Sequence, residues 1–271
     1  MRPAADVAWT NDKSPARFVG RIKKRGSRAM SIRIAMWSGP RNISTAMMRA
    51  FENRADAAVV DEPFYAAYLL QTGVDHPMRD EVLASQPTDW RAVVGELSGP
   101  TPDGAAVWYQ KHMTHHMLAD FGLDWTADCR NAFLIRAPEA VLTSYTVKRE
   151  NVTLADIGVE RQRELFEREC DRLGAAPPVI DSADVLANPR ATLSKLCAAL
   201  EIEFSERMLR WPAGKRDSDG VWAPVWYDAV ERSTEFGPPR AAVETKDMSD
   251  NVRRIADAAR PHYERLAAHK L

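Results

Sequence analysis

The sequence predicts an α/β fold in which a mostly parallel sheet lies between two layers of helices. Short apolar runs alternate along the chain with longer segments whose apolar residues recur at helical spacing. Such alternation is typical of crossover units, which place successive strands parallel in one sheet. The chain has 271 residues, 45% of them hydrophobic, which is enough for a sizeable core. We expect residues 30–271 to form one three-layer α/β/α domain, because no repeat or linker divides them.

Five segments are expected to be strands, because each is short, apolar and bounded by turn residues. They are residues 32–36, 57–60, 105–110, 131–135 and 178–180. Polar residues follow most of these runs directly, and the carboxyl ends of parallel strands share one edge of a sheet. These polar ends are Ser38 to Arg41, Asp61 with Glu62, Lys111 with His112, and Arg136. Two arginines and a lysine at one edge predict a polyanionic ligand.

The segments between the strands carry apolar residues three and four positions apart, which predicts helices. We expect helices at residues 43–51, 65–70, 90–97, 118–121, 138–147, 159–173, 189–199 and 251–268. The side chain of Asn42 is expected to cap the first of them, and that of Thr114 to cap the helix at 118–121. Residues 71–104 are rich in turn residues and read as an insertion that covers a substrate.

Composition limits the kinds of partner and the cellular compartment that we expect for this protein. The net charge of −1 gives no case for nucleic-acid binding, and no apolar run is long enough to cross a bilayer. Three widely spaced cysteines form no metal-ligand pattern and favour a reducing compartment, so we expect a cytoplasmic protein. Residues 1–29 are basic and lack the apolar core of a secretory signal, which predicts a disordered leader.

The turn after the first strand, Ser38-Gly39-Pro40-Arg41-Asn42-Ile43-Ser44-Thr45, predicts an anion site. A helix that begins there presents free backbone N–H groups and the positive end of its dipole. Arg41 and two hydroxyls add donors for a phosphate or another tetrahedral oxyanion. The lysine and the glycine-rich run of a Walker A loop are absent, which disfavours an ordinary nucleoside-triphosphate site.

A second anion site is predicted at the end of the fourth strand. Arg136 ends that strand, and Ser144 follows about two helical turns into the next helix. An arginine at a strand end and a hydroxyl on the adjacent helix can hold one phosphate, with the guanidinium supplying paired donors.

Together these motifs resemble those of sulfotransferases that use 3′-phosphoadenosine 5′-phosphosulfate. The stretch from Ser38 to Thr45 resembles the family's 5′-phosphosulfate loop, and Leu134-Ile135-Arg136-Ala137-Pro138 with Ser144 is similar to its 3′-phosphate motif. The resemblance covers roughly residues 32–227 and implies the P-loop-NTPase-like topology of that family. It is nearest to a bacterial branch whose homologues are sometimes labelled aminotransferase-like, although the sequence shows no separate sign of pyridoxal chemistry.

The resemblance implies two groups of donor-binding residues. The 5′-phosphosulfate would be held by Gly39, Pro40, Arg41, Asn42, Ile43, Ser44 and Thr45, and the 3′-phosphate by Arg136 and Ser144. Gly214-Lys215-Arg216 looks like a degenerate form of the family's C-terminal 3′-phosphate loop, with Ala223 where a lysine commonly follows the tryptophan. This implies phosphate contacts for Lys215 and Arg216, and adenine stacking for Trp222.

Two residues compete as the base. Glu62 resembles the glutamate of a Glu-Pro motif, and His112, which follows Lys111, resembles the Lys-x-His base region of other branches. Arg41 and Lys111 would complete the catalytic set. His115 and His116 are additional candidates. The alternative for Glu62 is a structural ion pair, and the alternative for the histidines is packing. No metal is implied.

The implied activity is transfer of a sulfuryl group from 3′-phosphoadenosine 5′-phosphosulfate to a hydroxyl or amine of a small-molecule acceptor, by in-line displacement. One alternative is a nucleotide-dependent kinase of related fold, which would need the missing Walker lysine. Another is a catalytically inactive nucleotide-binding module, which would keep Arg41, Arg136 and Ser144 without needing Glu62. The sequence leaves the acceptor and the oligomeric state open.

Overall fold

The computed structural model describes residues 31–147, 151–238 and 248–271, and its centre is a five-stranded parallel sheet. The strands are ordered β2-β3-β1-β4-β5 across the sheet. Their bounds are β1 (Ile32–Ser38), β2 (Ala57–Asp61), β3 (Val107–Met113), β4 (Arg130–Ile135) and β5 (Val179–Asp181). The five expected strands are therefore confirmed, while the expected leader, residues 1–29, lies outside the described residues.

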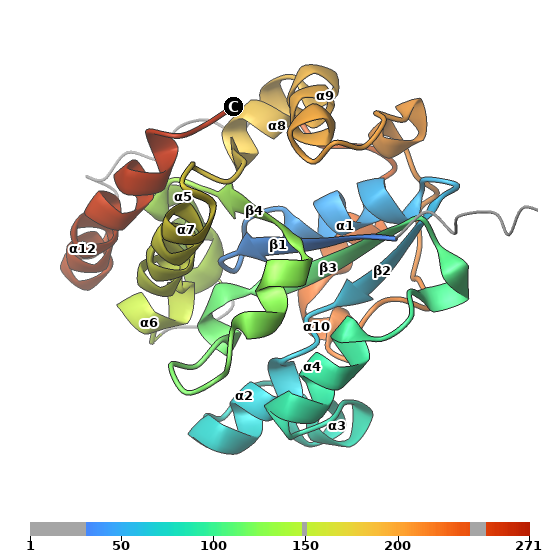
Figure 1. The fold of residues 1–271 in the computed structure, drawn as a ribbon. Coiled ribbons are helices and arrows are strands. Elements are labelled where there is room, and N and C mark those ends of the chain that lie inside the picture. The colour runs from blue at the N-terminus through green and yellow to red at the C-terminus, as the bar shows by residue number, and fades with distance from the viewer. Residues whose placement is uncertain (1–30, 148–150, 239–247) are drawn as a thin grey trace, which may run out of the picture.

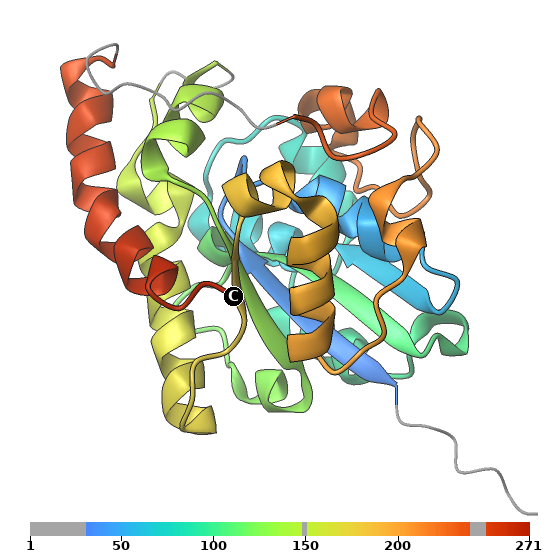
Figure 2. The same ribbon diagram turned by 90° about the horizontal axis from the view of Figure 1, so that it is seen from above.

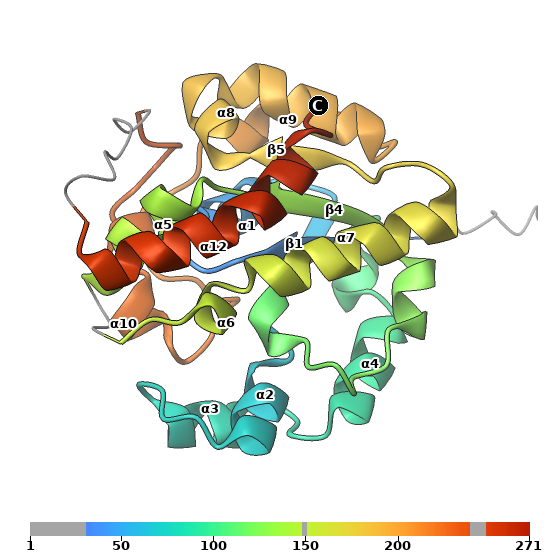
Figure 3. The ribbon, with the colours of Figure 1, turned by 90° about the vertical axis from the view of Figure 1, so that its left-hand side faces the viewer.

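Helices cover both faces of the sheet, as expected for a three-layer α/β/α fold (Figure 1). One face packs against α1 (Ser44–Glu52), α8 (Ser182–Ala187) and α9 (Pro189–Ala199), and α9 crosses over the strands in Figure 2. The other packs against α4 (Trp90–Ser98), α7 (Val159–Leu173) and α12 (Asp250–Ala267), of which α7 and α12 lie side by side in Figure 3.

The alternation of side chains along β1 explains why both faces are apolar. Ile34 and Met36 belong to the core cluster that contains α1, α8 and α9, whereas Ala35 and Trp37 belong to the cluster that contains α4, α7 and α12. Successive side chains of a strand point to opposite faces, so a central strand needs apolar residues at every position.

The remaining helices lie around the edges of these layers. They are α2 (Tyr65–Thr72), α3 (Arg79–Ser85), α5 (Pro138–Thr146), α6 (Leu154–Ile157), α10 (Ala223–Trp226) and α11 (Asp228–Glu231). The 71–104 insertion thus contains α3 as well as the expected helix at α4. No helix of the described residues is long and apolar enough to cross a membrane.

Two local predictions are wrong. Residues 118–121 form no helix, and Thr114 instead begins a single 3-10 turn, Thr114–His116, with its hydroxyl donating to the carbonyl of Gly158 at 2.8 Å. Asn42 does not cap α1, because Ile43 occupies the N-cap position and the Asn42 amide donates to the carbonyl of Leu134 at 3.0 Å. In both cases a tertiary partner outcompetes the local cap.

The order of the strands creates a crevice at one end of the sheet. From β1 the chain passes through α1 to β2 on one side, and from β4 it passes through α5, α6 and α7 to β5 on the other. Because the two connections diverge between neighbouring strands, the carboxyl ends of β1 and β4 border the place where α/β proteins bind ligands.

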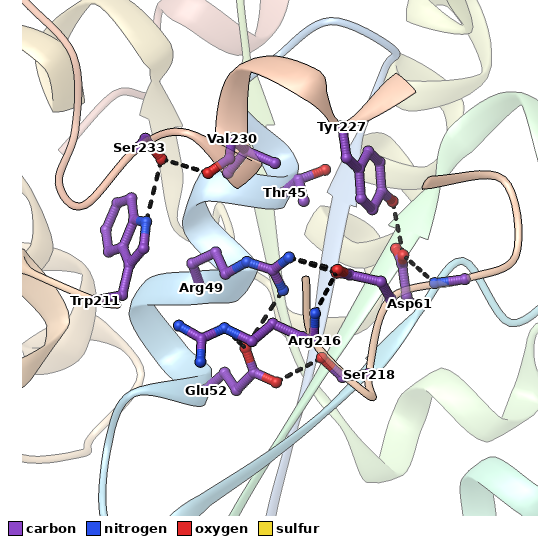
Figure 4. A network of polar contacts seen from close by, with 12 residues as sticks. Thr45, Arg49, Glu52, Asp61, Trp211, Arg216, Ser218, Tyr227, Val230 and Ser233 are labelled. Atoms are coloured by element: carbon purple, nitrogen blue, oxygen red, sulfur yellow. Dashed lines mark hydrogen bonds and ion pairs between the residues drawn. The ribbon is translucent and has the colours of Figure 1, made fainter. Parts of the chain in front are cut away.

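A polar network joins the segment that follows α9 to this end of the sheet (Figure 4). Arg49 on α1 lies 2.6 Å from one carboxylate oxygen of Asp219 and donates to the other at 2.7 Å. The Ser218 hydroxyl donates to Glu52 on α1, and the Gly220 amide donates to Asp61 at the end of β2, at 3.1 Å. These contacts fix the loop of residues 216–220 between α1 and β2.

Replacing Asp219 by alanine should destabilise the protein by about 3 kcal/mol, since breaking a buried ion pair leaves an uncompensated charge. The Arg49 side chain is 1% exposed, and Glu52, at 3.4 Å, is its remaining acidic neighbour. Urea denaturation of both proteins measures the loss. Glu206→Ala is the matched control, because Arg190 and Glu206 form a pair with more than half of each side chain exposed, where little is lost. Equal midpoints for Asp219→Ala and the wild type would contradict the prediction.

Candidate functional site

A cavity of about 380 Å³ lies at the carboxyl ends of β1, β2, β3 and β4. Its volume is within the range of small-molecule sites. The loop before α1 forms one wall and the segment from α10 onward forms another. The predicted site residues among its lining are Pro40, Arg41, Asn42, Ile43, Ser44, Thr45, Glu62, Lys111, Arg136, Ser144 and Trp222, together with His115 and His116.

The loop between β1 and α1 has a backbone suited to an anion. Arg41 and Ile43 have φ values of 60° and 56°, in the left-handed region, and such alternation turns successive backbone N–H groups to one side. A side chain at Gly39 would place its Cβ 2.5 Å from the carbonyl oxygen of Ile157, so only glycine fits there. The N-terminus of α1, which is the positive end of its dipole, directly follows the same loop.

The two predicted phosphate motifs meet in the cavity. The Arg41 Nε donates to the Ser144 hydroxyl at 3.0 Å, and the Arg136 guanidinium donates to the carbonyl oxygen of Arg41. Arg41 and Ser144, assigned by the resemblance to different phosphates, are therefore in direct contact. The arrangement concentrates two guanidinium groups and a hydroxyl in one corner of the cavity.

Glu62 sits in the cavity wall directly after β2, with φ 42° and a side chain 11% exposed. Its Oε1 accepts from Lys111 Nζ at 2.8 Å, and its Oε2 lies 4.0 Å from His116 Nδ1. Burial raises the pKa of Glu62 above its ordinary value, the ammonium of Lys111 opposes that rise, and the neighbouring Asp61 adds to it. A carboxylate with a raised pKa is a better proton acceptor near neutral pH.

Lys111 is the centre of a buried cluster. Its Nζ lies 2.8 Å from Asp61 Oδ1, 2.6 Å from the Tyr227 hydroxyl and 3.1 Å from Thr45 Oγ1, in addition to its contact with Glu62. Burial would lower the pKa of Lys111, but the two carboxylates outweigh that effect and hold the pKa well above its ordinary value. Lys111 therefore carries a permanent positive charge between the anion loop and Glu62.

His112 lies on the other side of the sheet, and its prediction as the base is wrong. Side chains alternate along β3, so Lys111 faces the cavity and His112 faces the core. The His112 ring stacks on Trp37 with centroids 4.6 Å apart, and its Nε2 lies 3.2 Å from Gln110 Oε1. Burial lowers the pKa of His112 to about 3. It has no access to a substrate in the cavity.

The structure also differs from the prediction of phosphate contacts by Lys215 and Arg216. Lys215 is exposed and Arg216 donates to the carbonyl of Pro212 at 2.7 Å, and neither lines the cavity. Trp222 does line it, but its side chain is 1% exposed and its indole N–H donates to the Tyr227 hydroxyl at 3.0 Å. A ring without an open face cannot stack on adenine, so the structure gives Trp222 a packing role.

The polar contacts in the wall of the cavity were not predicted. The Tyr227 hydroxyl donates to Asp61 Oδ2 at 2.6 Å, and Tyr65 and His76 are joined through a hydroxyl-to-Nδ1 contact of 2.7 Å. Asp61 was visible in the sequence as a polar strand end, but no local pattern connects it to a tyrosine so distant in the chain. In the part of the chain that the structure describes, no group of three or more His, Cys, Asp or Glu side chains is placed to hold a metal ion.

Comparison with curated proteins finds relatives in Arabidopsis thaliana. Branched-chain-amino-acid aminotransferase-like protein 2 is 35% identical over 212 residues, which is 78% of this chain and 37% of that protein. Branched-chain-amino-acid aminotransferase-like protein 1 is 35% identical over 237 residues, which is 87% of this chain and 42% of that protein. The chain thus spans less than half the length of these relatives.

Solved structures share the fold. A sulfotransferase domain from the Synechococcus PCC 7002 olefin synthase superposes with a TM-score of 0.51 at 17% identity, over 84% of this chain and 94% of that one. A sulfotransferase from Alicyclobacillus acidocaldarius gives a TM-score of 0.50 at 14% identity, over 89% and 96% of the two chains. The family described as "Sulfotransferase domain" matches residues 32–270. The chain is therefore a member of the sulfotransferase domain family.

Proposed function

We propose that residues 30–271 act as one domain that transfers a sulfuryl group from 3′-phosphoadenosine 5′-phosphosulfate to a hydroxyl or amine of a small-molecule acceptor. The observation that carries the proposal is the convergence of Arg41, Arg136 and Ser144 in one cavity with the buried carboxylate of Glu62. The first three groups suit a donor with several phosphates, and the fourth suits removal of a proton.

The donor side of the cavity fits a polyanion on three counts. Two guanidinium groups supply charge and paired donors, the two left-handed residues of the loop give a backbone suited to an anion, and α1 adds the positive end of its dipole. Because Arg41 and Ser144 are in contact, we assign them jointly to the phosphate groups rather than one to each end of the nucleotide.

Sulfuryl transfer in this site would proceed by in-line displacement. The acceptor oxygen or nitrogen forms a bond to sulfur as the bond between sulfur and the phosphate oxygen breaks, and the electron pair leaves with the phosphate. Arg41 and the loop amides stabilise the charge that grows on the leaving phosphate, which favours the transition state over the ground state. Glu62 accepts the proton of the acceptor, and Lys111 keeps that carboxylate ionised and in place.

Binding measurements separate this function from its two alternatives. Isothermal titration compares 3′,5′-adenosine bisphosphate with ATP and magnesium, and a transfer assay follows with a panel of phenols, alcohols and amines. The proposal expects the bisphosphate to bind more tightly and sulfate to be transferred. Preference for ATP would identify a kinase, and tight binding of the bisphosphate without transfer to any acceptor would identify an inactive module.

Arg41→Ala should abolish transfer and weaken binding of the bisphosphate by about 10- to 100-fold, the value of one or two charge-assisted hydrogen bonds. Titration calorimetry and a sulfate-transfer assay measure the two effects. Arg190→Ala is the control, because this arginine is exposed and lies outside the cavity lining. If Arg41→Ala bound the nucleotide as tightly as the wild type, the assignment of the Arg41 guanidinium to the donor site would be wrong.

Glu62→Gln should lower kcat by about 100-fold or more, as expected for loss of a general base, while nucleotide affinity stays near that of the wild type. Since burial raises the pKa of Glu62, its ionised fraction falls as pH drops through that raised value. As the pH is lowered, the wild-type rate should therefore begin to fall at a pH above the ordinary carboxyl pKa of about 4.3. The rate of the variant should not show this fall. Glu164→Gln, a carboxylate outside the cavity, is the control. A fully active Glu62→Gln would disprove the assignment.

A further inference from the structure

His116 has a buried polar atom without a hydrogen-bond partner in the described residues. Its Nδ1 is enclosed, its side chain is 2% exposed, and the residue lines the cavity. Buried polar atoms are almost always hydrogen-bonded, so an orphan atom at a cavity indicates a missing partner. The atom that faces it is Oε2 of Glu62, at 4.0 Å.

The His116 ring is held in place by aromatic neighbours and cannot move to close this gap without losing them. It stacks on Tyr65, with centroids 4.4 Å apart and an interplanar angle of 12°, and on Tyr68, with centroids 4.9 Å apart and an angle of 27°. The Tyr65 hydroxyl is itself in contact with His76. The separation between Nδ1 and the carboxylate is therefore a fixed feature of the wall.

His116 is neutral, so that one ring nitrogen carries a hydrogen and the other carries a lone pair. Burial holds the pKa of His116 well below its ordinary value, and the charges of neighbouring histidines and of Lys111 lower it further. The ionised carboxylate of Glu62 attracts an N–H and repels a lone pair. The tautomer with the hydrogen on Nδ1 is therefore the favoured one.

A separation of 4.0 Å is too long for a direct hydrogen bond, but an oxygen atom at ~2.8 Å from both Glu62 Oε2 and His116 Nδ1 would satisfy both atoms. We propose that this is the place of the acceptor nucleophile, and that the nucleophile is a hydroxyl oxygen, so that the enzyme sulfates an alcohol or a phenol rather than an amine. This inference rests on the proposed function and narrows it.

The electron count favours a hydroxyl. Its hydrogen is donated to Glu62, one lone pair accepts the N–H of His116, and the second lone pair attacks sulfur. The new oxygen–sulfur bond forms as the sulfur–phosphate-oxygen bond breaks, the proton passes to Glu62, and the electron pair leaves with the phosphate. A neutral amine has one lone pair, and a bond from His116 would occupy it. A protonated amine would meet the ammonium of Lys111, 2.8 Å from the other oxygen of the same carboxylate.

The test compares acceptors that differ only in the nucleophilic atom: phenol with aniline, benzyl alcohol with benzylamine, and cyclohexanol with cyclohexylamine. Formation of 3′,5′-adenosine bisphosphate from the sulfuryl donor is followed for each. The hydroxyl member of a pair should have a kcat/KM at least about 10-fold higher. An amine that reacts as fast as its hydroxyl partner, or faster, would overturn the inference.

Two variants separate the N–H of His116 from its packing. His116→Phe keeps a ring for stacking but has no donor, and His116→Asn keeps an N–H near the position of Nδ1. We expect His116→Phe to lower kcat for a hydroxyl acceptor by about 10- to 100-fold with unchanged affinity for the bisphosphate, and His116→Asn to recover most of the loss. Thermal unfolding verifies that both variants fold. Full activity of His116→Phe, or equal losses in the two variants, would contradict the donor role.

A measurement without any acceptor tests the same inference directly. In nucleotide-free protein labelled with ¹⁵N at histidine, the His116 resonances, assigned by comparison with His116→Asn, should report hydrogen on Nδ1. Hydrogen on Nε2 would overturn the inference even if no compound of the panel were sulfated. Failure of the wild type to bind the bisphosphate would instead refute the proposed function, and the two failures are thereby distinguished.

Discussion

The structure around the cavity depends on one buried ammonium group. Lys111 Nζ is shared by two carboxylates and two hydroxyls from three separate parts of the chain. The carboxylates of Asp61 and Glu62 lie at the end of β2, Thr45 lies on α1, and Tyr227 lies in the segment after α10. Burying a charge is favourable only when its partners are all in place. The lysine therefore couples the anion loop, the proposed base and the C-terminal wall of the cavity into one arrangement.

Asp61 extends this arrangement beyond the lysine. Its second oxygen accepts from the Tyr227 hydroxyl and from the Gly220 amide, and the loop before Gly220 is tied to α1 through Asp219 and Arg49. The segment that the resemblance identified as a phosphate loop is thus bound to α1 and to the end of β2. One of its two cationic residues, Arg216, is bound within the protein: its guanidinium donates to the carbonyl of Pro212 and lies 3.7 Å from Glu52 of α1, and its backbone N–H donates to Asp219.

Periodicity was sufficient to predict the strands and the layers, because those features depend on residues close in sequence. The errors arose where a distant partner decides the outcome. The caps at Asn42 and Thr114 were lost to carbonyl groups far along the chain. The position of His112 was within reach of the sequence, since neighbours in a strand face opposite sides and His112 could not line the same cavity as Lys111. The proximity of His116 to Glu62 could not be predicted from the sequence, because it depends on where the 3-10 turn after β3 places His116.

The cavity has two chemically different sides, and their difference fits the direction of the reaction. Guanidinium groups gather on the side that we propose for the donor, where negative charge would grow on a leaving phosphate. On the side that we propose for the acceptor, His116 is neutral, and Lys111 is already matched by Asp61 and Glu62. A cation left unmatched beside Glu62 would lower the pKa of that carboxyl and weaken it as a base, whereas burial without a cation would raise the pKa until the group stayed protonated. Lys111 therefore opposes the effect of burial on the pKa of Glu62, as expected for the base that we propose.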